Sequence, residues 1–285
     1  MKARPRTPVG PTTRSVLLLA LLAVPLLVRP AGAQFTAAEA AERPRWEAFL
    51  KEADIVAQIR LKFEEGVTEP WKLTLRQGDI LTSALWKNPS GVRGGYWEGW
   101  KYEIAAYVLD KLVGLHMVPP TVEREFSGQA GSCQLWIEGT TTHRDMGASG
   151  RDLAPLQTDD WKKAGYMAQF FDNLIGNEDR HEGNVLVTKD YRAVLIDHSR
   201  TFRTTPSFVD GIPFSEKNVP AASLMRKLPR ALVRRTTALT ENAVRAAVGD
   251  LLTDEEIKAV MARKRLLIRE VQRIIAEFGE GDVLY

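Results

Sequence analysis

Two short segments carry the polar side chains whose types and spacing could do chemistry. Residues 176–184 read Gly-Asn-Glu-Asp-Arg-His-Glu-Gly-Asn, and residues 194–202 read Val-Leu-Ile-Asp-His-Ser-Arg-Thr-Phe. Asp179 and Asn184 lie five positions apart, and Asp197 follows Asn184 by thirteen positions. Carboxylates and a primary amide at such intervals are typical of a metal-assisted or acid–base site, provided that the fold brings them together.

The residues between these segments predict how they meet. We expect a β-hairpin formed by Asn184–Thr188 and Arg192–Asp197, with a two-residue turn at Lys189-Asp190. A hairpin brings its two ends together, so Asn184 and Asp197 should share one rim, with the segment around residue 179 on the adjoining loop.

This arrangement suits phosphoryl transfer with a divalent metal ion. The carboxylate of Asp197 and the amide oxygen of Asn184 can hold the metal against the phosphates, while Asp179 accepts the proton of the attacking hydroxyl. The spacing D-x-x-x-x-N equals that of the kinase catalytic loop. Either segment alone could be a solvated turn, but the joining hairpin favours a site.

A kinase also needs a lysine on an inner strand and a glutamate on the helix that follows. Lys87 ends a predicted strand, Ile80–Lys87, and Glu103 lies on the predicted helix from Tyr96 to Leu115. We therefore predict an ion pair between Lys87 and Glu103, with their charged ends within about 4 Å.

A nucleotide requires further contacts for its base and its phosphates. The segment 134–139 runs from a strand into a glycine and predicts a hinge that contacts the adenine, with Gln134, Trp136 and Glu138 as nucleotide-binding residues. Thr68, in the loop 66–70, is the candidate phosphate contact on the other side.

The elements that must position these residues are predicted from periodicity. They are a helix over 36–60 interrupted at Pro44, a hairpin over 71–87, strands at 118–122 and 132–137, a helix from Thr158 to Gly176, and two or three helices ending near Phe278. This order predicts an α+β fold, with a β-rich N-terminal lobe over 34–139 and a mainly helical C-terminal lobe over 140–285.

The first 33 residues predict a signal peptide. A basic stretch is followed by an apolar run over 15–28 and by small residues at Ala31 and Ala33. The run spans only about 21 Å as a helix, which is short for a membrane span, although an uncleaved N-terminal anchor is the alternative. We expect export to a periplasmic or extracellular location.

Composition excludes a collagenous, coiled-coil or wholly disordered chain. Of 285 residues, 44% are apolar and 26% charged, which is ordinary for a globular chain, and the single cysteine excludes an internal disulfide. Beyond the basic first 34 residues the charges nearly balance, so we expect no nucleic-acid partner. Basic stretches at 226–235 and 263–265 could contact a membrane surface but are more typical of solvated helix faces. A monomer is expected.

With these residues in view, a family resemblance can be named. The patterns G-N-x-D-R-x-x-G-N-x-L and L-I-D-H-S-x-x-F, together with the segment E-I-A-A-Y-V-L-D-K-L-V-G-L-H-M-V-P-P-T-V, resemble the phosphatidylinositol 3-/4-kinase-like catalytic superfamily. They are also similar to secretory-pathway protein and xylose kinases related to the Golgi casein kinase. The resemblance covers roughly residues 55–280 and implies a two-lobed protein-kinase-like fold.

The resemblance also implies a set of roles. Lys87 would contact the α- and β-phosphates of ATP and Glu103 would orient it, Asp179 would be the catalytic aspartate, and Asn184 and Asp197 would bind Mg²⁺ or Mn²⁺. The γ-phosphate would pass to a hydroxyl on a protein, sugar or lipid.

The chain departs from the kinase pattern in two places, and two other functions remain open. There is no G-x-G-x-x-G loop, and Asp197-His198-Ser199 stands where Asp-Phe-Gly is usual. A kinase fold without activity, acting as a nucleotide-binding module, is the first alternative. The second is a metal-dependent hydrolase built from His181, Glu182, Asp197 and His198.

Overall fold

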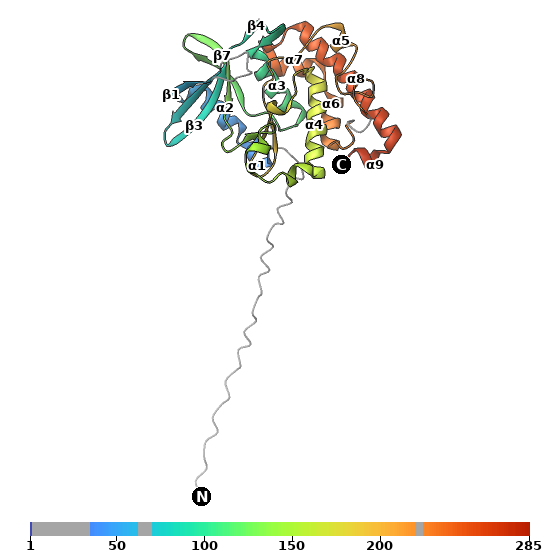
Figure 1. Ribbon diagram of the computed structural model, residues 1–285, viewed down its shortest axis with the longest axis horizontal. Helices are drawn as coiled ribbons and strands as arrows, with labels where there is room; N and C mark the ends of the chain where they lie inside the picture. The colour runs from blue at the N-terminus through green and yellow to red at the C-terminus, as the bar shows by residue number, and fades with distance from the viewer. Residues whose placement is uncertain (2–34, 62–69, 221–224) are drawn as a thin grey trace. The chain divides into compact units, whose positions relative to one another are not determined.

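The structure is a computed structural model, and it describes residues 1, 35–61, 70–220 and 225–285. The predicted signal peptide and Thr68 lie outside these residues, apart from Met1. Everything described below belongs to the unit Ala31–Tyr285. This unit is α+β, with an antiparallel sheet in its N-terminal part and mainly helices in its C-terminal part (Figure 1).

The N-terminal part is built on a five-stranded sheet. In spatial order its strands are β1 (Asp54–Arg60), β2 (Trp71–Gln77), β3 (Ile80–Lys87), β7 (Gln129–Leu135) and β6 (Thr121–Phe126), and every neighbouring pair is antiparallel. The predicted hairpin over 71–87 is present as β2 and β3. Alternate residues of these strands are buried and pack against α2 (Arg43–Glu52), namely Leu73, Leu75, Ala84 and Trp86. The sheet therefore fixes the position of Lys87 at the end of its central strand.

The segment before β2 differs from the predicted single helix. It forms α1 (Ala37–Ala41), α2 and β1, and Pro44 lies in the first turn of α2, where its missing N–H is not needed. The prediction of helix over 54–60 is wrong. The pattern Asp-Ile-Val-Ala-Gln-Ile-Arg can line one helix face, but pairing with β2 decides the conformation.

A second hairpin precedes the long helix of this part. The predicted helix does not begin at Tyr96, because β4 (Ser90–Arg93) pairs with β5 (Tyr96–Gly99). The helix α3 (Trp100–Val113) starts directly after this hairpin and ends at Gly114, which has a φ of 72°. Glu103 consequently lies in the first turn of α3, close to the end of β5.

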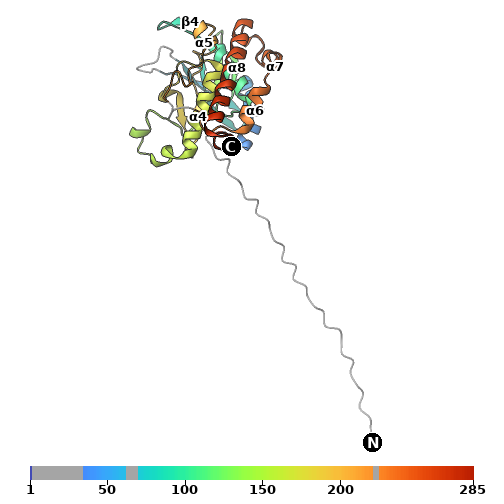
Figure 2. The same ribbon diagram turned by 90° about the vertical axis from the view of Figure 1, so that its right-hand side faces the viewer.

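The C-terminal part is mainly helical. Its principal helices are α4 (Asp159–Ile175), α6 (Arg230–Ala238), α7 (Glu241–Val248) and α8 (Asp254–Phe278), with short helices α5 (Pro206–Val209) and α9 (Glu280–Val283). Single 3₁₀ turns lie at Met146–Ala148, Ala154–Gln157, Glu182–Asn184 and Gly249–Leu251. The predicted helix capped by Thr158 is confirmed as α4, which packs along α8 (Figures 1 and 2). Among the described residues, no helix is both long and apolar enough to cross a bilayer.

A small sheet carries the predicted catalytic segments. Strands β8 (Thr141–Thr142), β9 (Val185–Val187) and β10 (Ala193–Leu195) lie in the order β10-β9-β8. The hairpin of β9 and β10 is the expected one, but its turn has three residues rather than two. Thr188 pairs with Arg192, and Tyr191 adopts a left-handed φ of 61°. With this three-residue turn, the backbone of Asn184 lies opposite Ile196, one residue before Asp197.

Candidate active site

Lys87 joins two carboxylates that come from distant parts of the chain. Its Nζ lies 2.8 Å from Oε1 of Glu103 on α3 and 3.0 Å from Oδ1 of Asp197, which follows β10. The predicted Lys87–Glu103 ion pair is therefore present, and the contact with Asp197 adds a third member. We call these three residues the lysine triad. The Glu103 side chain is 2% exposed and the Asp197 side chain 36%, so one carboxylate lies behind the lysine and the other faces solvent.

The charges within the lysine triad follow from burial and proximity. Burial by itself would lower the pKa of Lys87, but the charges of Asp197 and Glu103 outweigh burial and raise it, so the ammonium persists. Burial would raise the pKa of Asp197, yet the adjacent Lys87 lowers it. Because two carboxylates share one ammonium, burial and the charge of Asp197 together raise the pKa of Glu103. Asp197 therefore keeps its negative charge.

Asp197 also has an unusual backbone. Its φ is 58°, in the left-handed region that aspartate tolerates better than most other residues. Such conformations cost energy and are found most often at functional sites. Here it turns the chain out of β10 so that the carboxylate reaches Lys87.

Asp179 and Asn184 lie on the loop that follows α4. The helix ends at Gly176, whose φ is 65°. The amide Nδ2 of Asn184 donates to the carbonyl of Asp179 at 2.9 Å, and the N–H of Asp179 donates to Oδ1 of Asn177 at 3.0 Å. These two bonds fix the backbone of Asp179, while its side chain stays 32% exposed. The loop thus presents the carboxylate to the cavity.

Two oxygen atoms at this rim suit a hard divalent cation. Within the described part of the chain, Oδ1 of Asn184 and Oδ2 of Asp197 accept no hydrogen bond, although Asn184 is only 5% exposed. One carboxylate oxygen and one amide oxygen are ligands that Mg²⁺ and Mn²⁺ accept, with phosphate oxygens completing the shell. These two oxygen donors therefore fit Mg²⁺ or Mn²⁺, the metals that the family resemblance implies. No cluster of three or more His, Cys, Asp or Glu side chains suited to a metal occurs among the residues described.

Arg180 holds the two predicted catalytic segments together, and the sequence alone did not predict this role. Its Nε and Nη2 donate to the two oxygens of Asp172 at 3.0 and 3.1 Å, and its Nη1 donates to the carbonyls of Asn184 and Ile196 at 2.6 and 2.9 Å. Its Nη2 also lies 2.9 Å from Nε2 of His198. Asp172 is completely buried. The sequence held one signal of this role, because Asp172 is a charged residue within the mainly apolar stretch Phe170–Ile175.

His198 is a buried structural residue. Its backbone N–H donates to Oε2 of Glu103 at 3.0 Å. Burial, reinforced by the positive charge of Arg180, lowers the pKa of its ring well below the usual value. The ring is therefore neutral and supports the lysine triad from behind.

The predicted hinge residues are only partly brought to the site. Gln134 and Trp136 line the cavity. The side-chain amide of Gln134 donates to Oγ1 of Thr121 at 2.9 Å, and the backbone N–H of Trp136 donates to the carbonyl of Ser83 at 3.0 Å. Glu138 is exposed and does not line the cavity. The Gln134 amide and the Trp136 backbone N–H are thus engaged within the fold, and contact of this segment with a base stays a prediction.

A cavity of about 650 Å³ contains the site. Its apolar lining residues include Leu85, Pro119, Leu135, Trp136 and Ile137, and its polar lining residues include Lys87, Asp179, Asn184, Asp197 and Arg200. This size and this mixture of apolar and polar lining residues are typical of pockets for small molecules such as a nucleotide.

Comparisons with known proteins agree with this geometry. No model of a protein family matches the sequence. A phosphatidylinositol 4-kinase gamma 4 from rice (Oryza sativa subsp. japonica) is 32% identical over 127 residues, which are 38% of this chain and only a fifth of the rice protein. The structure of hydra Fam20 with sugar has a TM-score of 0.61 at 15% identity, covering 89% of this chain and 95% of that one. The Golgi casein kinase with Mn/ADP bound has a TM-score of 0.59 at 14% identity, covering 86% and 78%.

These similarities define the class of fold. The chain has the atypical kinase fold of Fam20 and the Golgi casein kinase, and the resemblance inferred from the sequence is confirmed at this level. At these identities the structural likeness concerns the fold.

Proposed function

We propose that this protein is an ATP-dependent phosphotransferase that passes the γ-phosphate to a hydroxyl group, assisted by Mg²⁺ or Mn²⁺. The observation that carries the proposal is the lysine triad at the wall of the cavity. A cation held between a buried and an accessible carboxylate, on an atypical kinase fold, is what positioning of a polyphosphate requires. One structural neighbour, the Golgi casein kinase, has Mn and ADP bound, which supports the choice of ligands.

In this proposal each residue has a distinct task. Lys87 contacts the α- and β-phosphates, and Glu103 fixes its ammonium group. Asp197 and Asn184 supply oxygen ligands for the cation, which when bound neutralises charge on the phosphates. Asp179 orients the acceptor hydroxyl and takes its proton.

The hydrolase alternative is weakened by the positions of its histidines. His198 is completely buried and contacts Arg180, whereas His181 is exposed and accepts a hydrogen bond from the N–H of Gly183. The four residues considered for a hydrolase thus do not converge on one point.

The experiment that tests the proposal is phosphate transfer from labelled ATP with Mn²⁺. Three acceptor classes would be offered in parallel, namely an acidic protein such as casein, a sugar and a phosphatidylinositol vesicle, because the relatives named above point to each. Labelling of one class supports a kinase and names the acceptor. Nucleotide binding without any transfer would support the inactive module, and absence of both would refute the proposal.

We further propose that the protein is exported and cleaved after Ala33. The order of basic, apolar and small residues supports this. Mass spectrometry of protein recovered from its native compartment should find Gln34 at the N-terminus. An intact Met1 would favour the anchor instead.

A further inference from the structure

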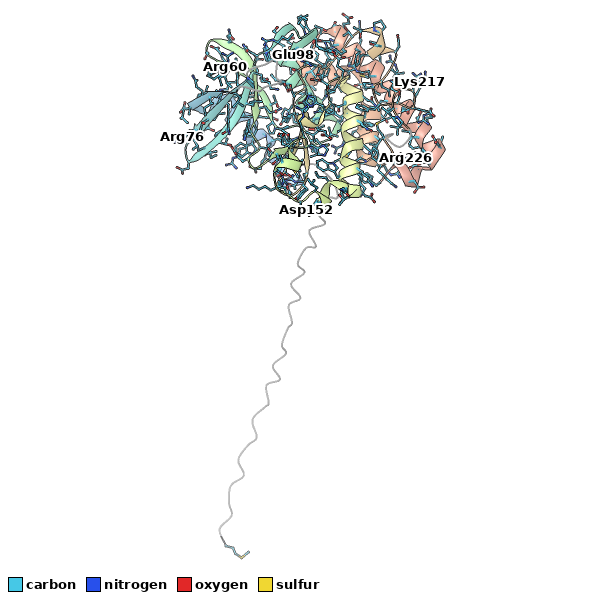
Figure 3. All side chains as sticks on the ribbon, viewed as in Figure 1. Arg60, Arg76, Glu98, Asp152, Lys217 and Arg226 are labelled. Atoms are coloured by element: carbon cyan, nitrogen blue, oxygen red, sulfur yellow. The ribbon has the colours of Figure 1, made fainter. Side chains whose placement is uncertain are left out.

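Glu98 is a buried carboxylate that the proposed mechanism does not use. It lies on β5, near the junction of the sheet and the helices (Figure 3). It is 3% exposed and lines the cavity. A carboxylate buried to this degree is costly unless a cation compensates it. Its partner is Arg200, whose Nε and Nη2 donate to Oε1 of Glu98 at 2.9 and 2.7 Å.

Arg200 is held firmly on this side of the cavity. Its guanidinium group lies over the ring of Tyr96, 4.9 Å from the centroid, and its side chain is 18% exposed. The N–H of Gly99 donates to the carbonyl of Ser199 at 3.0 Å, so the backbones next to Glu98 and Arg200 are joined directly. The negative charges of Glu98 and Asp179 outweigh burial and raise the pKa of Arg200, which stays cationic.

The other side of the guanidinium group faces the proposed catalytic residue. Nη1 of Arg200 lies 3.3 Å from Oδ2 of Asp179. Within the described residues, this is the contact that the Asp179 carboxylate makes, because the bonds to Asn177 and Asn184 involve only its backbone. Without Arg200 the carboxylate would be free to rotate about its side-chain torsions.

We propose that Arg200, seated by Glu98, is a positioning residue that fixes the carboxylate of Asp179 for the acceptor hydroxyl. This inference rests on the proposed function and deepens it. Glu98, Arg200 and Asp179 form a second cation-centred group, the arginine triad, beside the lysine triad. The β4–β5 hairpin thereby becomes part of the catalytic arrangement, because it carries both Glu98 and the ring that Arg200 stacks on.

The test compares Arg200→Gln with the full-length wild-type protein in transfer from labelled ATP and in calorimetric nucleotide titration. We expect kcat to fall about 100-fold, the size expected when a reacting group is misplaced by about 1 Å, while nucleotide affinity stays unchanged. Arg200→Lys keeps the charge but loses the planar fork, so it should recover part of the rate. Glu98→Gln should also lower kcat, but by a smaller factor than Arg200→Gln.

A double variant separates positioning from a direct contact with the phosphoryl group. If Arg200 acts through Asp179, then Arg200→Gln should cost little more in an Asp179→Asn background, because residues acting as a unit are not additive. If the loss of kcat in the double variant equals the product of the losses in the two single variants, the inference is overturned. Unchanged kcat in Arg200→Gln would overturn it as well.

Arg203→Gln is the matched control. Arg203 forms an ion pair with Glu178, the residue directly before Asp179, but neither lines the cavity. It should alter thermal stability without a selective loss of kcat, and an equal loss of kcat there would show that Arg200 is merely structural. Should Arg200→Gln fail to fold, Arg200→Lys and Glu98→Gln carry the same test. If the wild-type protein transfers no phosphate, the proposed function itself fails, whereas an active wild type with an unaffected Arg200→Gln refutes this inference alone.

Discussion

The lysine triad and the arginine triad have the same plan and different surroundings. In each, a cation lies between a deeply buried carboxylate and an accessible one. The buried members, Glu103 and Glu98, have side chains 2% and 4% exposed, and the accessible members, Asp197 and Asp179, are 36% and 32% exposed. Each triad also joins the N-terminal part of the chain to a segment far along the sequence.

The two triads differ in their central cation. Lys87 is a compact charge, 10% exposed, and lies within 3.0 Å of both of its carboxylates. Arg200 is a planar fork that binds Glu98 closely but approaches Asp179 only to 3.3 Å. A tight pair suits a carboxylate that must stay ionised beside a dication, and a looser one suits a carboxylate that must meet a neutral hydroxyl. In the proposed mechanism, one arrangement of charges therefore serves two tasks, and single substitutions can test each of them.

Asp197→Asn should produce the largest effect, because it removes the charge that faces the metal and the polyphosphate. We expect both Mg-nucleotide binding and phosphate transfer to be abolished, while Lys87 remains paired with Glu103 and the fold persists. Calorimetric titration with Mg-nucleotide, together with a thermal melt, would measure this. Retained nucleotide affinity would contradict the assignment of Asp197 as the principal metal ligand.

Asn184→Ala should have an intermediate effect. It removes a neutral oxygen ligand and the hydrogen bond to the carbonyl of Asp179, so metal affinity and rate should weaken together. Titrating the rate with Mn²⁺ in the variant should show a higher concentration requirement than in the wild-type protein. An unchanged requirement would place the metal elsewhere.

Asp179→Asn should affect transfer alone. A positioned acid–base group contributes roughly 10²–10⁴ in rate, and the nucleotide should still bind, because this side chain faces a neutral hydroxyl. Single-turnover transfer and nucleotide titration of the same preparation would separate the two quantities. If Asp179→Asn loses the nucleotide while Asp197→Asn keeps it, the two aspartates have been assigned in reverse.

The sequence predicted the Lys87–Glu103 pair of the lysine triad and missed the arginine triad, for a physical reason. Lys87, Glu103 and Asp197 end or begin recognisable elements, and their order agrees with a known kinase pattern. The arginine triad depends on the β4–β5 hairpin, but residues 96–99 were predicted to begin a helix, so Glu98 was assigned to the wrong element. Its contact with Arg200 spans 102 positions along the chain, and no local pattern indicates such a contact.

Local structure was predicted well where periodicity and turn chemistry agreed. The β2–β3 hairpin and the capped helix α4 are examples. Predictions failed where tertiary pairing outweighed local preference, as in β1, or where one residue adopted a left-handed conformation, as Tyr191 does in the β9–β10 turn. The hinge stays a prediction, because Gln134 and Trp136 line the cavity while the Gln134 side-chain amide and the Trp136 backbone N–H are engaged inside the sheet.

The smallest expected effect concerns His198, which supports both triads from behind. Its N–H binds Glu103, and its Nε2 accepts from Arg180, which in turn holds the segments that carry Asp179 and Asp197. An arginine can only donate, so Nε2 must be unprotonated and the ring neutral. Burial and the charge of Arg180 keep the pKa of His198 well below its ordinary value of 6.5 in the folded protein.

The sign of the resulting pH dependence follows from linkage. Below about pH 6.5 the unfolded chain takes up a proton on this ring while the folded chain does not, so the free energy of unfolding falls as the pH falls. The slope for one such proton is at most about 1.4 kcal/mol per pH unit. His198→Gln keeps an acceptor for Arg180 but has no titrating ring, so this part of the slope should vanish. Urea unfolding of both proteins at about pH 7.5, 6.5 and 5.5 measures the difference. Parallel pH profiles would mean that the folded chain protonates His198 over the same pH range as the unfolded chain, so that at low pH Arg180 is held by Asp172 and the backbone carbonyls alone.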